Sequence, residues 1–189
     1  MMKTLTDEYR SHLAEMLAAV ERCVYFLDGS CARISWPLTG DVLAGRKKEV
    51  ELFMALSAVN ERFAKLQDTL GAAMRHAALL AGESSDTFIR VLSHFEKVGV
   101  LSSIADWQEM RALRNSAAHE YGTDYNKTAE HFNTLHELSV RLYQVADLFA
   151  AYCRERLGVE LGRTEFTEDV ASIFKRNRLN QDVAMTTGS

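Results

Sequence analysis

Apolar residues recur in steps of three and four along most of this chain, which is the spacing of one face of an α-helix. One stripe spans residues 7–27, a longer one spans residues 47–80, and a last long one follows Asp124. Shorter stripes lie between them, and no alternating pattern typical of β-strands is present. We therefore predict an all-α fold, an antiparallel bundle of four to five helices joined by short connections.

Glycine and proline positions predict where the helices end. Gly29 is expected to cap the first helix, and residues 29–45, which contain the single proline Pro37, are expected to form a loop packed by its own apolar residues. Gly82 and Gly99 should end the next two helices. Beyond residue 162 the pattern weakens, so we predict one domain over residues 1–162 and a partly disordered tail over 163–189 with one short helix at 167–175.

Charge and cysteine content limit the possible functions. The 189 residues carry a formal net charge of −4, so a broad basic surface for nucleic acid is not expected and contact with RNA would need a local basic patch. Three cysteines without a C-x-x-C pair favour a reducing, cytoplasmic location over a disulfide framework or a zinc site. The first residues do not resemble a signal peptide, and no apolar run is long enough for a membrane helix.

One stretch carries chemically active residue types, and it reads Arg114-Asn115-Ser116-Ala117-Ala118-His119-Glu120-Tyr121. Five residues turn a helix by about 500°, so Arg114 and His119 would lie about 140° apart on a regular helix and would not share a face. Two copies related by a twofold axis could instead bring two arginines and two histidines into one cleft. We therefore expect a homodimer that brings these residues together at its interface.

Such a cleft suits the cleavage of RNA. Arginine stays charged and can bind a phosphate through two hydrogen bonds, and histidine can lose and gain a proton near neutral pH. RNA supplies its own nucleophile, the 2′-OH, so no metal or cofactor is required. The alternative is that Arg114 and His119 only stabilise a helix C-terminus through the helix dipole.

The segment from Met110 to Tyr121 resembles the signature of the HEPN superfamily, an R-x4–6-H motif that closes a helix in a small all-α bundle. The pattern Arg114…His119-x-Tyr121 is similar to the R-x4-H-x-Y motif of HepT-like toxins, and the resemblance covers roughly residues 47–157. It implies a homodimer that cuts RNA without metal, with Arg114 and His119 catalytic. It also implies a nucleotidyltransferase antitoxin that attaches AMP to Tyr121.

Four further residues are expected to support this site, and they are Asn115, Tyr121, Glu120 and Arg111. Arg111 would hold a flanking phosphate if the fold places it beside Arg114. A second hypothesis is a non-catalytic subunit that binds a nucleotidyltransferase or its nucleotide, and a third is a helical dimerisation module. A metal site is not expected, because the histidines are not spaced to share a helix face.

Overall fold

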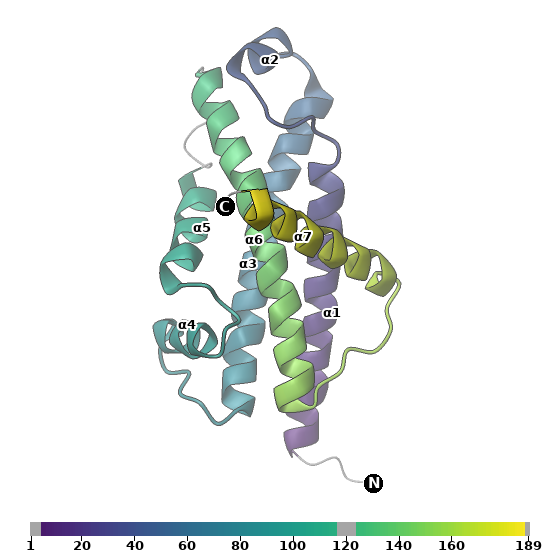
Figure 1. Ribbon diagram of the computed structural model, residues 1–189, viewed down its shortest axis with the longest axis vertical. Helices are drawn as coiled ribbons and strands as arrows, with labels where there is room; N and C mark the ends of the chain where they lie inside the picture. The colour runs from purple at the N-terminus through teal and green to yellow at the C-terminus, as the bar shows by residue number, and fades with distance from the viewer. Residues whose placement is uncertain (1–4, 117–123, 188–189) are drawn as a thin grey trace.

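The computed structural model describes residues 5–116 and 124–187, and within these ranges every regular element is an α-helix (Figure 1). The helices are α1 (Leu5–Cys31), α2 (Gly40–Gly45), α3 (Val50–Leu80), α4 (Phe88–Lys97), α5 (Ile104–Ser116), α6 (Tyr125–Leu157) and α7 (Thr167–Thr187). The all-α prediction is confirmed. The described ranges contain seven helices rather than four or five, because two segments that were predicted as loop and tail form α2 and most of α7.

The long helices alternate in direction and form the bundle. In Figure 1, α1 runs upward, α3 runs downward, α5 runs upward and α6 runs downward. Helix α1 packs mainly on α3, and α6 packs on both of them, while α4 and α5 pack on α3 from one side. The antiparallel arrangement of successive long helices is therefore the one that short connections predict.

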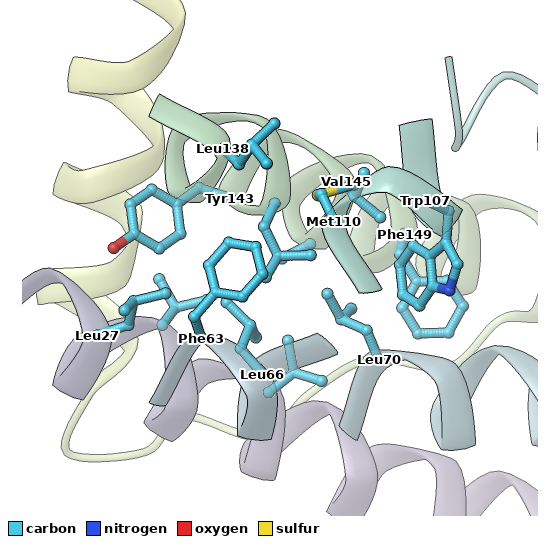
Figure 2. Packing of buried hydrophobic residues seen from close by; sticks show 14 of the residues in the cluster. Leu27, Phe63, Leu66, Leu70, Trp107, Met110, Leu138, Tyr143, Val145 and Phe149 are labelled. Atoms are coloured by element: carbon cyan, nitrogen blue, oxygen red, sulfur yellow. The ribbon is translucent and has the colours of Figure 1, made fainter. Parts of the chain in front are cut away.

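The core lies where α1, α3 and α6 meet (Figure 2). Phe63, Leu66 and Leu70 of α3 are fully buried, and Phe149 of α6 packs among the same group of side chains. The predicted stripe of α3 is confirmed over this part of the helix. Val50, which was placed in the stripe, is 63% exposed because it is the first residue of α3 and lies beyond the packed region.

Helix α1 does not end at Gly29, as the sequence suggested, but continues to Cys31. A glycine inside a helix costs about 0.5–1 kcal/mol relative to alanine. The last turn offsets this cost by burying Ser30 and Cys31, and the Ser30 hydroxyl donates a 2.8 Å hydrogen bond to the Phe26 carbonyl. Gly29 therefore needs no left-handed conformation, whereas Gly82 and Gly99 adopt positive φ where helices were predicted to end.

The segment after α1 packs on α6 rather than on itself. Leu38 exchanges two backbone hydrogen bonds with the Asn133 side-chain amide, at 2.7 and 2.9 Å. The Trp36 ring stacks on His136 with 4.3 Å between ring centroids. Gly40 opens α2, and a Cβ there would lie 1.9 Å from the Asn126 side chain, so the close approach of α2 to α6 requires glycine.

The C-terminal segment is helical from Thr167 to Thr187, where the sequence predicted a short helix inside a partly disordered tail. Helix α6 ends at Leu157 and is capped by Gly158, whose φ of 60° is left-handed. Helix α7 then crosses α1 and α6 and buries Val170 and Ile173 against them (Figure 1). These few apolar contacts, which the weak periodicity did not predict, dock the segment on the bundle.

The three cysteine side chains pack in or against the hydrophobic core. All three cysteines are free thiols, and burial raises the pKa of Cys31 to about 11 and that of Cys153 to about 12. No helix in the described part of the chain combines the length and the apolar character needed to cross a membrane.

Candidate functional site

Helix α5 carries the first residues of the motif, and local hydrogen bonds fix where it begins. The backbone N–H of Asp106 donates to the Ser103 hydroxyl at 2.9 Å, which caps the first turn. The Ser102 hydroxyl donates to the Asp106 carboxylate at 2.6 Å and lowers the pKa of that carboxyl. Trp107 and Met110 are buried, so one face of α5 is fixed against the bundle.

Two side chains join α5 to α3 through backbone carbonyls. The Gln67 amide on α3 donates to the Trp107 carbonyl at 3.0 Å, and the Arg114 guanidinium on α5 donates to the Ala64 carbonyl at 2.8 Å. Gly71 lies one turn beyond Gln67 on α3, and a Cβ there would lie 3.1 Å from the Phe88 ring. The position of Arg114 is therefore set by the packing of α5 on α3.

Arg114 also forms an ion pair within its own subunit. Its Nη2 lies 2.8 Å from Oδ1 of Asp68, and its side chain is only 8% exposed while that of Asp68 is 67% exposed. The Arg114 Nε is buried and has no hydrogen-bond partner. The guanidinium is thus held on α3, and any contact with a ligand must use the remaining hydrogens of its two Nη atoms.

The structure places the other predicted site residues as follows. Arg111 and Asn115 are exposed on α5, and Arg111 lines the same pocket as Arg114. His119, Glu120 and Tyr121 lie outside the described residues, so the structure brings together the two arginines and leaves the predicted Arg114–His119 pairing untested.

A pocket of about 290 Å³ lies between α3, α4 and α5 at this position. It is lined by Gln67, Asp68, Gly71, Ala72, Arg75, Phe88, Trp107, Arg111 and Arg114. The Arg75 guanidinium carbon lies 5.7 Å from the centre of the Phe88 ring, a cation–π contact. We call this space the arginine pocket, because three guanidinium groups line it against a single carboxylate.

Arg75 and Asp68 were not predicted from the sequence as site residues, although the hydrophobic pattern of α3 indicated that both are exposed. Lys65, Asp68 and Arg75 fall on the polar side of the α3 stripe, so their exposure could be predicted from periodicity. Their proximity to Arg111 and Arg114 could not, because residues some 40 positions apart meet only when α5 packs on α3.

The chemistry available in the arginine pocket is anion binding. Guanidinium groups bind phosphate oxygens through paired hydrogen bonds, and arginine keeps its charge at any physiological pH. Within the described part of the chain, no group of three or more His, Cys, Asp or Glu side chains is arranged to hold a metal ion.

The ion pair between Arg114 and Asp68 predicts that removing the arginine destabilises the protein more than removing the carboxylate does. Replacing Arg114 by alanine should lower the free energy of unfolding by about 1.5–3 kcal/mol, because a buried cation and its hydrogen bonds are lost. Asp68→Asn should cost less than about 1 kcal/mol, since the carboxylate is exposed and an oxygen acceptor remains. Urea unfolding of both variants checks this, and equal losses would show that Arg114 does not fasten α5 to α3.

Comparison with known proteins does not assign the chain to a family. No protein-family model matches it, and searches of curated proteins and of solved structures gave no match. The resemblance to the HEPN superfamily thus depends on the residues from Met110 to Tyr121 and on the order of the predicted helices, and its functional consequences are proposals.

Proposed function

We propose that this protein is a metal-independent endoribonuclease of the HEPN type, that it acts as a homodimer, and that it is the toxin of a toxin–antitoxin pair. The observation that carries the proposal is the arginine pocket at the end of α5, where Arg75, Arg111 and Arg114 line one space. The motif histidine follows Arg114 by five residues. A phosphate bound in this pocket would therefore lie at the end of α5, five residues before His119 in the sequence.

The proposed reaction is a transesterification within RNA. One His119 imidazole removes the proton of a 2′-OH, and the 2′-oxygen attacks the adjacent phosphorus. The bond from phosphorus to the 5′-oxygen breaks, and the His119 imidazole of the partner subunit protonates that oxygen. The products are a 2′,3′-cyclic phosphate and a free 5′-OH, so atoms and charge balance without a metal ion.

Arg114 is suited to a fixed electrostatic role in this reaction. Its bonds to Ala64 and Asp68 use one hydrogen on each Nη, and each Nη has a second hydrogen that can reach a phosphoryl oxygen. A donor that is already oriented does not have to reorganise as charge develops on the phosphate. Arg111 and Arg75 would hold the neighbouring phosphates.

The intrasubunit ion pair favours a second candidate function. Asp68 neutralises part of the Arg114 charge, whereas no described carboxylate lies within ion-pair distance of Arg75 or Arg111. The protein would then be a non-catalytic subunit that binds a nucleotidyltransferase or its nucleotide, with the phosphates of the nucleotide in the arginine pocket. An AMP adduct on Tyr121 in protein isolated from its native host would support the toxin–antitoxin assignment.

The test is RNA cleavage by the purified full chain in the presence of EDTA. We expect fragments that end in a 2′,3′-cyclic phosphate, identified by mass spectrometry, at a rate that added EDTA does not change. Intact RNA, or cleavage that appears only after Mg²⁺ is added, would contradict the nuclease proposal. Inactive protein that co-purifies with a nucleotidyltransferase would support the second candidate.

A further inference from the structure

A second pocket adjoins the arginine pocket on the other side of α3. It has a volume of about 660 Å³ and lies between α1 and α3, whereas the arginine pocket lies between α3 and α5. Asp68 and Ala72 line both pockets, so they form one continuous surface across α3. Figure 1 shows α1 and α5 on opposite sides of α3, which is the arrangement that such a surface requires.

The second pocket adds three basic side chains from two helices, Arg22 of α1 and Arg62 and Lys65 of α3. No carboxylate of the described residues lies within ion-pair distance of any of the three, whereas Arg176 and Arg178 of α7 are paired with Asp28 and Asp147. The only acidic residue that lines either pocket is Asp68, which Arg114 already binds. This surface is therefore strongly positive in a chain whose formal net charge is −4.

The second pocket also combines aromatic and cationic side chains. The guanidinium carbons of Arg22 and Arg62 lie 5.4 and 5.3 Å from the centre of the Phe26 ring. Arg62 is held there by hydrogen bonds to the Phe26 carbonyl and the Ser30 hydroxyl, which orient it without neutralising its charge. Phe26 is half-buried and lines the pocket together with Met16. Unpaired bases stack on surfaces of this kind.

We propose that the two pockets form one groove that binds single-stranded RNA, with Arg22, Arg62 and Lys65 holding phosphates away from the motif. The helical rise places Arg62 and Arg75 about 20 Å apart along α3, which is long enough for several nucleotides. A single strand fits better than a duplex, because only unpaired bases can contact the apolar side chains Met16 and Phe26 that line the second pocket. The inference rests on the proposed function, since it assigns the path of that reaction's substrate.

The test measures binding separately from cleavage. Fluorescence anisotropy of a short single-stranded oligonucleotide with 2′-O-methyl groups reports binding alone, because its 2′-oxygen cannot attack. The variant is Arg22→Ala with Lys65→Ala, both exposed side chains. The matched control is Lys97→Ala with Lys175→Ala, which removes the same charge from exposed positions on α4 and α7.

We expect the groove variant to bind the oligonucleotide about 20-fold more weakly than the wild type at roughly 0.1 M salt. The slope of the logarithm of the association constant against the logarithm of the salt concentration should become less steep by about 1.4, because two phosphate contacts are lost. The control should match the wild type. If the groove variant binds the oligonucleotide more weakly but the wild type does not cleave unmodified RNA, the groove would be supported and the nuclease proposal refuted. Cleavage with equal affinities in variant and wild type would overturn the groove alone.

Three other results would also overturn the groove. One is the absence of oligonucleotide binding to the wild type, and another is equally tight binding of a duplex. The third is that the groove variant binds the oligonucleotide with wild-type affinity but forms an oligomer of different mass, as measured by light scattering. That last result would assign the surface to a contact between protein chains.

Discussion

Replacing His119 by alanine is expected to slow RNA cleavage by at least about 10²-fold, and by up to about 10⁴-fold for each proton-transfer role that is lost. In the proposed mechanism, His119 of one subunit serves as the base and His119 of the other serves as the acid. The wild-type rate should accordingly show a bell-shaped dependence on pH, because one imidazole must be neutral and the other protonated. Initial rates with unmodified RNA, measured across pH in EDTA, provide the data.

His12→Ala is the matched control for this experiment. His12 lies on α1, its side chain is 58% exposed, and it lines neither pocket of the groove. We expect its removal to leave both the rate and the pH profile unchanged. His119→Asn covers the case in which the alanine variant does not fold. A folded His119 variant that cleaves at the wild-type rate would refute the proposed mechanism, and the groove could still bind RNA.

Phe63→Ala is expected to produce the largest loss of stability among single substitutions in α3. Phe63 is fully buried where α1, α3 and α6 meet, and Figure 2 shows its ring among side chains of the core. Truncation of a buried phenylalanine costs about 3–5 kcal/mol, because transfer free energy is lost and a cavity remains. For a domain of this size, that corresponds to a drop in Tm of roughly 6–20 °C.

Calorimetry or thermal unfolding followed by circular dichroism measures this loss. Met54→Ala on the same helix is the control, since Met54 is 66% exposed and its truncation should change the free energy of unfolding by less than about 0.5 kcal/mol. A Phe63→Ala variant that unfolds within about 1–2 °C of the wild type would show that the Phe63 side chain is not packed in the core. The packing described for α1, α3 and α6 would then be wrong.

The sequence predicted the features that depend on local spacing. Periodic apolar residues placed the long helices, and the stripe of α6 is buried as expected. Asp124 caps α6, accepting hydrogen bonds from two backbone N–H groups, and Gly82 and Gly99 adopt the positive φ predicted for helix ends. These features follow from interactions between residues a few positions apart, so the sequence alone contains their cause.

Tertiary contacts overrode the local signals in two places. Gly29 was a plausible helix end, but the burial of Ser30 and Cys31 extends α1 past it. Residues after 162 showed weak periodicity, yet α7 forms because Val170 and Ile173 find apolar surface on α1 and α6. In both segments, contacts with distant helices provide stabilisation that no local pattern reveals.

The residues of the candidate site also divide into those that the sequence identified and those that only tertiary packing brought together. The sequence alone identified Arg114 and Arg111 and placed them near the end of a helix. Only the packing of α5 on α3 paired Arg114 with Asp68 and set Arg75 beside them. Only the packing of α1 on α3 placed Arg22 in one pocket with Arg62 and Lys65. Charges that are dispersed along the chain form a local field only when the fold brings their helices together, because electrostatic interactions depend on distance in space and not on separation in sequence.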